Sequence, residues 1–320
     1  MTGLLEHCRP GDWPERPEAR FAARIVDLHR DPGALDAATE KPLLAARRAW
    51  RGLGLIGLAD DEGVRLNGGR TGARHGPDAF RSALAGYGAA DAVGLAGFEV
   101  PVFDLGNIAA ADGLAETHDR VTATVARALE AGLMPVGIGG GHDLTFPEVR
   151  AVIDHLVKPQ DAAILGVYID AHLDVREQEG SGMAFRRLIE HGGIDELHLF
   201  GMDRLSNTGA HLDWFRNSGG VLADWEAEFW PTSDYQFFSI CLDAIDMAQA
   251  PGVSAPAPAG LPASTVAGYA EAAGRQPGVC CFDIMELSPP NDENNRTARL
   301  AAHLFLRFLA GLAQRPRPKG

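Results

Sequence analysis

The chain has 320 residues, of which 46% are hydrophobic and 22% charged, close to the values of ordinary globular proteins. Its formal net charge of -14 argues against nucleic-acid binding, which needs a basic surface. No apolar run reaches the roughly 18 residues needed to cross a bilayer, and the N-terminal segment lacks the apolar stretch of a secretory signal. We therefore expect a cytoplasmic protein without nucleic-acid or membrane partners.

Residues 1 to 50 are rich in Pro, Arg and Asp and are interpreted as an N-terminal extension packed on the main body, with helical potential over 34–50. Beyond them, apolar runs typical of strands alternate with segments of helical pattern. The expected strands are 53–59, 100–105, 134–138, 163–169, 196–201, 236–242 and 279–284. A glycine-rich loop is expected over 64–74, and helices over 77–84, 115–131, 146–155 and 297–314.

This alternation predicts an α/β fold, a three-layer α/β/α sandwich with a central, mostly parallel sheet. Near-continuous apolar strands are typical of a sheet that helices cover on both faces. No internal repeat or low-complexity linker divides the chain, so residues 51 to 320 are predicted to form one catalytic domain. In such sheets, ligands bind at the carboxyl ends of the strands.

Polar motifs follow three of the expected strands. The first is GGGHD at 139–143, where the glycines allow tight turns and close approach of a ligand. The second is DAHLD at 170–174, whose carboxylates and imidazole alternate with period 2 and so share one face of an extended segment. The third is CLD at 241–243, which repeats that spacing.

A single His or Asp at a strand end is usually a cap or turn residue, but three such segments are hard to explain structurally. Buried acids repel each other, and leaving them uncompensated costs several kcal/mol. A cation removes this cost, and oxygen ligands with one or two imidazoles suit Mn²⁺. Two such ions would bridge a water and lower its pKa, giving hydroxide near neutral pH.

In this order and spacing, the three segments resemble the signature blocks of the arginase/agmatinase (ureohydrolase) family, with similarity over roughly residues 50 to 312. NGGRTGARHGPDAFR at 67–81 and DIMELSPPND at 283–292 resemble two further blocks. The resemblance implies an arginase-like fold, a homo-oligomer and two Mn²⁺ per subunit. By the same resemblance, the manganese ligands are His142, Asp170, His172, Asp174, Cys241 and Asp243.

Cys241 departs from the family, which usually has Asp at that position. A thiolate is softer than a carboxylate and favours Zn²⁺ or Fe²⁺, so metal identity and occupancy of the second position stay open. The resemblance also gives catalytic roles to Asp174, which would bridge the metals and accept the proton of water, and to Glu286. Glu286 matches the acid that grips an amidine or guanidine group, and its structural alternative is a surface salt bridge. The family's proton-shuttle His falls at Ser181, so arginase activity is not expected.

The substrate is suggested by two segments, APGVSAP at 250–256 and GSGMAFRRLI at 180–189, which resemble those of formimidoylglutamases. This resemblance implies hydrolysis of N-formimidoyl-L-glutamate to L-glutamate and formamide, a reaction of histidine degradation. Carboxylates of that small-molecule substrate call for Arg, and Arg176 and Arg186 are the candidates, with Asn207 as a further contact. Their structural alternative is pairing with neighbouring acids such as Glu177.

Two other functions remain open at this point. One is a different ureohydrolase activity, on agmatine or guanidinobutyrate. The other is a metal-poor relative without catalytic activity that acts as a binding protein, which only Cys241 favours. A dinucleotide-binding domain is excluded because GIGGGH at 137–142 lacks the GxGxxG spacing.

Overall fold

A computed structural model of the chain describes residues 3–15, 20–38, 50–88, 100–224 and 230–315. In these residues ten strands form one sheet in the order β1-β4-β3-β5-β10-β9-β6-β7-β8, and β2 also pairs with β4. Every pairing is parallel except that of β1 with β4. The strands are β1 (Cys8–Arg9), β2 (Ile25–Asp27), β3 (Gly52–Leu58), β4 (Val102–Ile108), β5 (Leu133–Gly139), β6 (Ile164–Ile169), β7 (Ile194–Phe200), β8 (Gly220–Leu222), β9 (Gln236–Cys241) and β10 (Val279–Met285).

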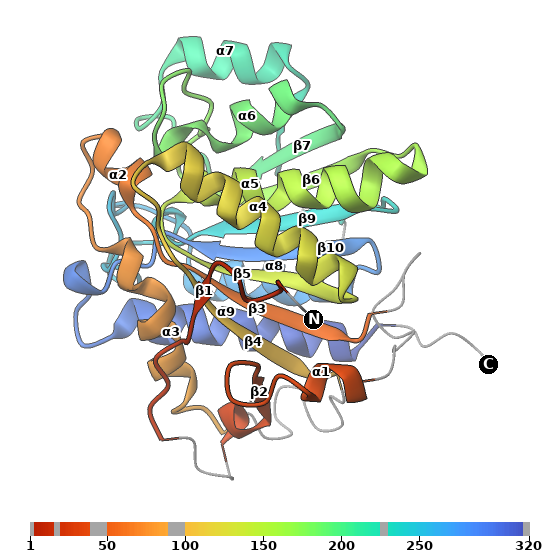
Figure 1. Cartoon of the computed structure of the whole chain (residues 1–320). Helices are drawn as coiled ribbons and strands as arrows, with labels where there is room; N and C mark the ends of the chain where they lie inside the picture. The colour runs from red at the N-terminus through yellow and green to blue at the C-terminus, as the bar shows by residue number, and fades with distance from the viewer. Residues whose placement is uncertain (1–2, 16–19, 39–49, 89–99, 225–229, 316–320) are drawn as a thin grey trace.

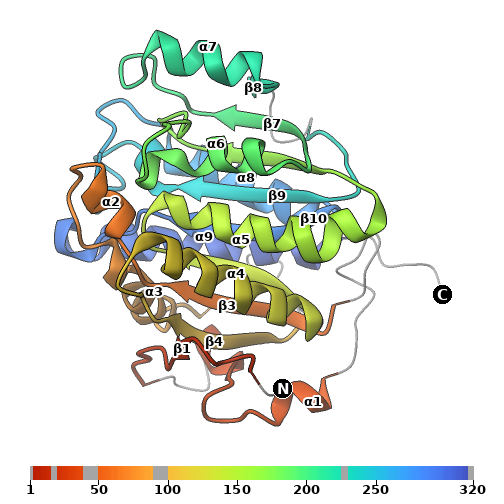
Figure 2. The same ribbon diagram turned by 45° about the horizontal axis from the view of Figure 1, so that its top comes forward.

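Helices cover both faces of this sheet. They are α1 (Ala34–Ala37), α2 (Glu62–Leu66), α3 (Gly76–Leu84), α4 (Leu114–Glu130), α5 (Thr145–Val152), α6 (Ala184–His191), α7 (Gly209–Asn217), α8 (Ala263–Arg275) and α9 (Arg296–Ala313). Figures 1 and 2 show α4, α5 and α6 on one face and α3, α8 and α9 on the other. The expected three-layer α/β/α sandwich is therefore confirmed.

The central strands form because their sequences are apolar on both faces. Every residue of β3, β5 and β10 is buried, as a parallel sheet between two helical layers requires. All seven expected strands are present, displaced by at most a few residues. The prediction of a glycine-rich loop over 64–74 was partly wrong, because α2 extends into this range and Val64 is buried.

Several elements were not expected from the sequence, among them α8 and the short strands β1, β2 and β8. The sequence of α8, ASTVAGYAEAAGR, is rich in Ala and Gly and carries a weak apolar pattern. It packs closely on α9 through Gly274 and Gly311, where a Cβ would collide with the backbone of the facing helix. The two glycines thus allow the backbones of these helices to approach each other closely.

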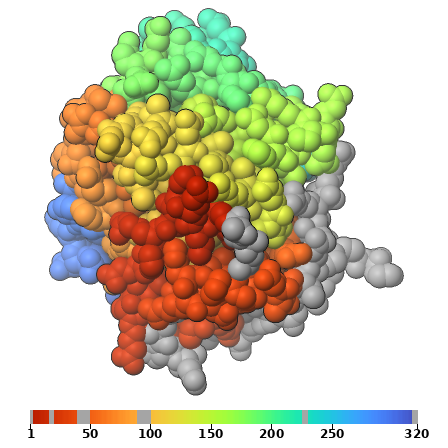
Figure 3. Space-filling model, viewed as in Figure 1, coloured from red at the N-terminus to blue at the C-terminus, as the bar shows by residue number. Residues whose placement is uncertain are grey.

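The N-terminal segment is tied to the main body through β4. β1 and β2 both pair with β4, and Figure 3 shows the N-terminal segment (red) against the surface beside α4 (yellow). Trp13 donates its indole N–H to Asp104, which also accepts from Arg81 Nε at 2.9 Å and Nη2 at 2.7 Å. Burial alone would raise the pKa of Asp104, but the Arg81 charge holds it below its usual value. The division of the chain at residue 50 stays a prediction, and residues 39–49 lie outside the described part.

In the described part of the chain, the helices are all too short or too polar to cross a bilayer.

The Arg81–Asp104 pair gives a stability prediction. Both side chains are 1% exposed, so replacing Arg81 with Ala leaves a buried carboxylate without its partner. We expect the free energy of unfolding to fall by about 3–5 kcal/mol. Chemical denaturation measures this, with Arg30→Ala as control, because that side chain is 70% exposed and its pair with Asp27 should contribute under about 1 kcal/mol. Equal effects of the two changes would contradict the argument.

Candidate metal centre

The polar motifs meet at the carboxyl ends of four neighbouring strands, in the order β5, β10, β9 and β6. Asp170 directly follows β6, Cys241 is the last residue of β9, and Glu286 directly follows β10. A cavity of about 200 Å³ lies at this edge of the sheet. The predicted residues that line it are His142, His172, Asp174, Arg176, Asn207, Cys241, Asp243 and Glu286, with Asp170 fully buried beneath them.

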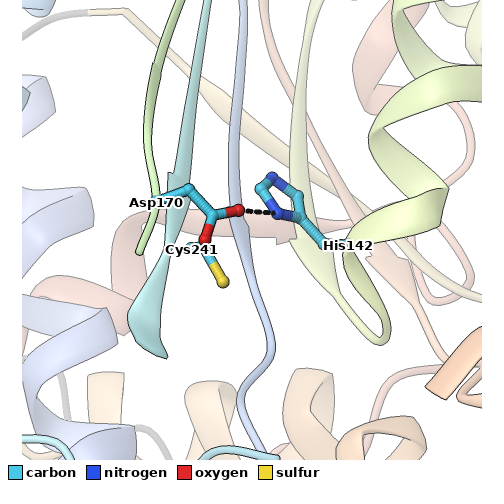
Figure 4. A group of neighbouring side chains, drawn as sticks. All are labelled: His142, Asp170 and Cys241. Atoms are coloured by element: carbon cyan, nitrogen blue, oxygen red, sulfur yellow. Dashed lines mark ion pairs between the residues drawn. The ribbon is translucent and has the colours of Figure 1, made fainter. Parts of the chain in front are cut away.

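The first group of ligand atoms surrounds His142. Its Nδ1 atom lies 2.7 Å from Oδ2 of Asp170 and 3.0 Å from Oδ2 of Asp174. His142, Asp170 and Cys241 each offer one ligand atom, and these three atoms lie within 4.8 Å of one another. Figure 4 shows these three side chains converging from separate strand ends.

The second group surrounds His172. Its Nδ1 atom lies 3.3 Å from Oδ1 of Asp170 and 3.3 Å from Oδ2 of Asp243. These three residues also bring their ligand atoms within 4.8 Å of one another. Asp170 belongs to both groups, so its two oxygens stand between two possible ion positions.

The contact geometry within the first group fits a cation. Nδ1 of His142 and Oδ2 of Asp170 are buried and have no hydrogen-bond partner, although they lie 2.7 Å apart. The two atoms are instead an ion pair, and Nδ1 of His142 also lies 3.0 Å from Oδ2 of Asp174, so three possible ligand atoms lie close together in a buried place. A cation bound among them would replace the imidazole proton as the positive charge that these carboxylates need. The residues present thus fit a binuclear site with oxygen, nitrogen and sulfur donors.

Electrostatics of the metal-free protein agree with this reading. Burial alone would lower the pKa of His172, yet Asp170 and Asp243 raise it to about 12. The pKa of His142 is also raised, because the effect of Asp170 and Asp174 is larger than the opposing effect of burial. Burial and the charge of Asp170 raise the pKa of Asp174 to about 6. Protons on imidazoles and carboxyls thus compensate the negative charge when no cation does.

Glu286 and Asp174 adopt unusual backbone conformations. Their φ angles are +67° and +48°, in the left-handed region that residues other than Gly seldom occupy. One carboxylate oxygen of Glu286, Oε1, accepts a hydrogen bond from the backbone N–H of His142 at 3.1 Å, and the other, Oε2, is buried without a partner. Such strain gathers at functional sites, and here it directs both carboxylates into the cavity.

A polar chain behind His142 was missed by the sequence analysis. Nε2 of His142 lies 3.0 Å from the hydroxyl of Ser239, which donates to Oδ1 of Asp283 at 2.5 Å. Thr145 donates to the other oxygen of Asp283 at 3.0 Å. This chain fixes the imidazole ring with Nδ1 facing the cavity. The only signal in the sequence was the presence of Ser239 and Asp283 within otherwise apolar strands.

Asn207 lines the cavity, but its side-chain amide is engaged by backbone. Its Oδ1 accepts from the N–H of Leu173 at 2.9 Å, and its Nδ2 donates to the carbonyls of Ala171 and Asp203, each at 2.8 Å. Ala171 and Leu173 flank His172. Asn207 therefore holds the DAHLD segment in shape, and this geometry favours a positioning role over the substrate contact expected from the sequence.

The two arginines differ in their surroundings. Arg176 lines the cavity, and a Cβ on Gly182 would lie 3.0 Å from its Cδ, so the glycine leaves room for this side chain. Arg186 instead pairs with Glu190 at 2.8 Å and lies over the ring of Trp214. Of the two, only Arg176 is among the described residues that line the cavity.

Two loops form the rim of the cavity. Arg70 donates to the carbonyls of Ser254 at 2.9 Å and Val253 at 2.6 Å, which joins the glycine-rich loop to the APGVSAP segment. Asn67 donates to the hydroxyl of Ser181 at 2.9 Å. The segments that carry the resemblance to formimidoylglutamases thus border the same cavity.

The positioning role of Asn207 leads to a test of metal affinity. Asn207→Ala removes three hydrogen bonds that shape the segment around His172, and we expect metal affinity to fall roughly 10–100-fold. Metal titration by calorimetry measures the change. Ser206→Ala is the control, because the Ser206 hydroxyl also lines the cavity but donates only to Asp203. Unchanged affinity in Asn207→Ala would refute the positioning role.

The raised pKa values of His142 and His172 predict proton release on metal binding. Both imidazoles hold protons at neutral pH without metal, and ligation needs the neutral ring, so metal affinity should rise as pH rises. Calorimetric titration with Mn²⁺ at pH 7 in buffers of different ionisation enthalpy measures the protons released. The same binding enthalpy in every buffer, after correction for metal–buffer binding, would show that no protons leave.

Comparison with known proteins agrees with this geometry. The model of the arginase family matches residues 52–311. Formimidoylglutamase of Rhodococcus opacus is 34% identical over 275 residues, covering 79% of this chain and 84% of that relative. Formimidoylglutamase of Aromatoleum aromaticum is 32% identical over 323 residues, covering 91% of this chain and 92% of that relative.

Solved structures are similar as well. The crystal structure of Trypanosoma cruzi formiminoglutamase with Mn²⁺ superposes with a TM-score of 0.73 at 31% identity, covering 87% of this chain and all of that one. Proclavaminate amidino hydrolase of Streptomyces clavuligerus gives a TM-score of 0.69 at 25% identity, covering 86% of this chain and 95% of that one. Because the family model matches residues 52–311, which is most of this chain, and the possible ligand atoms meet at the strand ends, the chain belongs to the arginase family.

Proposed function

We propose that this protein is a manganese-dependent hydrolase that converts N-formimidoyl-L-glutamate to L-glutamate and formamide. The observation that carries the proposal is a cavity in which two groups of metal-ligand atoms, a buried carboxylate and one arginine meet. The volume of about 200 Å³ is below the range of drug-sized ligands and suits an amino-acid derivative. The relatives named formimidoylglutamase support this choice of substrate.

Glu286 is the residue that we propose for the cationic formimidoyl group. Its Oε1 is held by the backbone of His142, while its Oε2 has no partner and faces the cavity. Burial and the nearby charge of Asp243 raise the pKa of Glu286 well above its ordinary value, so a cationic partner is needed to keep it charged. An amidinium group supplies that charge together with two N–H donors.

Arg176 is the residue that we propose for a substrate carboxylate. Among the described residues it has no acidic partner, in contrast to Arg186, whose charge Glu190 already meets. A guanidinium binds a carboxylate with two parallel hydrogen bonds, which fixes both position and orientation. Agmatine has no carboxylate, so Arg176 at this rim favours an acidic substrate over agmatine.

Manganese, when bound, supplies a Lewis acid and lowers the pKa of a water. His142, Asp170, His172, Asp174, Cys241 and Asp243 would hold it. Asp174 lies at the cavity wall, where it can take the proton of the attacking water. Glu286 meanwhile holds the formimidoyl carbon in place for attack. We further propose that the protein acts in the cytoplasm, as a homo-oligomer.

The first experiment is a substrate panel with the purified protein loaded with Mn²⁺. We expect glutamate release from N-formimidoyl-L-glutamate, lost on addition of a chelator and restored by Mn²⁺. Arginine, agmatine and guanidinobutyrate are tested alongside. Hydrolysis of one of them alone would replace the proposed substrate. If that one is agmatine, which has no carboxylate, the role of Arg176 is discarded as well. No turnover of any substrate, with fewer than two metals bound, would favour a binding protein instead.

Variants of the two arginines sharpen this experiment. Arg176→Ala removes the hydrogen bonds of a charged group to the substrate, which contribute about 1.5–3 kcal/mol to binding. KM for N-formimidoyl-L-glutamate should therefore rise roughly 10–150-fold. Arg186→Ala is the matched control, and its KM should stay within about twofold because its charge is met by Glu190. A large rise in KM in the control alone would assign the carboxylate to Arg186.

A further inference from the structure

The two groups of ligand atoms at the metal centre are chemically unequal. The group around His142 offers an imidazole nitrogen, an oxygen of Asp170 and the sulfur of Cys241. The group around His172 offers an imidazole nitrogen and oxygens of Asp170 and Asp243. Sulfur thus belongs to one group, while both share Asp170.

Cys241 is placed as a ligand by its surroundings and not only by its position in the sequence. It ends β9, is 1% exposed, and its sulfur lies 2.7 Å from Oδ1 of Asp243. Figure 4 shows the sulfur beside the carboxylate of Asp170, and Cys241 is one of the residues that line the cavity. Ligand atoms of His142 and Asp170, whose Nδ1 and Oδ2 form a buried ion pair, lie within 4.8 Å of this sulfur. The thiol therefore lies in one buried group with an imidazole and a carboxylate that could hold a metal ion.

Ligand softness decides what this sulfur does. Thiolates prefer Zn²⁺, Co²⁺ and other thiophilic ions, whereas sets of carboxylate and imidazole suit Mn²⁺. We propose that Cys241 ligates metal and makes the two ion positions different, so that the position beside His142 selects a thiophilic ion and the position beside His172 selects Mn²⁺. The inference rests on the metal dependence in the proposed function, but it concerns which ion each position takes.

The first test is spectroscopic and needs no substrate. Metal-free protein is kept reduced and titrated with Co²⁺, and a thiolate ligand gives an intense near-ultraviolet charge-transfer band. We expect the band in the unmodified protein and its loss in Cys241→Ser. Cys280→Ser is the matched control, because Cys280 is also a buried cysteine but lies in β10 and is not among the residues that line the cavity, and the band of this variant should remain.

A second measurement covers the case in which Cys241→Ser folds poorly. Protein loaded with two Mn²⁺ is titrated with Zn²⁺, and electron paramagnetic resonance follows the spin coupling between the manganese ions. We expect one equivalent of Zn²⁺ to replace one Mn²⁺, so that the coupled signal is lost and that of an isolated Mn²⁺ appears. Cys241→Asp, which restores an oxygen ligand, should lose this selective replacement.

Several outcomes would overturn the inference. They are a Co²⁺-loaded protein without the band, a band that survives in Cys241→Ser, and loss of both Mn²⁺ ions together as Zn²⁺ is added. Failure here is distinct from failure of the proposed function. A protein that hydrolyses N-formimidoyl-L-glutamate with Mn²⁺ but shows no band keeps its function and rejects Cys241 as a ligand.

Discussion

Four carboxylates, those of Asp170, Asp174, Asp243 and Glu286, lie around one cavity at the carboxyl end of the sheet. Mutual repulsion and the loss of water make this arrangement unfavourable unless positive charge is supplied. In the metal-free protein His142 and His172 supply it by holding protons. Divalent ions supply it better, because each brings two charges and accepts several donors at once. The surrounding contacts of Ser239, Asp283 and Asn207 then serve to keep the donors aimed at the ions.

The sequence was sufficient to predict the layers of the fold and the edge of the sheet at which the polar motifs meet, because both depend on local patterns. A strand buried on both faces is apolar along its whole length, as in β3 and β5, and the polar residue that follows it must lie at the sheet edge. The period-2 argument for DAHLD was wrong in its premise, because residues 171 and 172 form a bend and Asp174 has a φ of +48°. Asp170, His172 and Asp174 still lie at one edge of the sheet, with Asp174 against His142. Residues that act across the sheet left no such pattern, and this is why the chain from His142 through Ser239 to Asp283 was missed.

The roles of Asn207 and Arg186 show the limit of arguing from residue type. Both have the chemistry to bind a carboxylate, and both lie near the motif that suggested it. What each one does depends on its neighbours: backbone groups of Ala171, Leu173 and Asp203 engage the amide of Asn207, and Glu190 engages Arg186. A sequence names the possible donors, whereas only the fold tells which of them are already occupied.

The left-handed backbone conformation of Glu286 lowers the stability of the fold at a residue whose carboxylate lines the cavity. A φ of +67° costs a non-Gly residue of order 1–3 kcal/mol, and Gly would adopt it freely. Replacing Glu286 with Gly would therefore remove both the backbone strain and a buried acid whose Oε2 has no partner, so the stability of the fold alone does not account for Glu at this position.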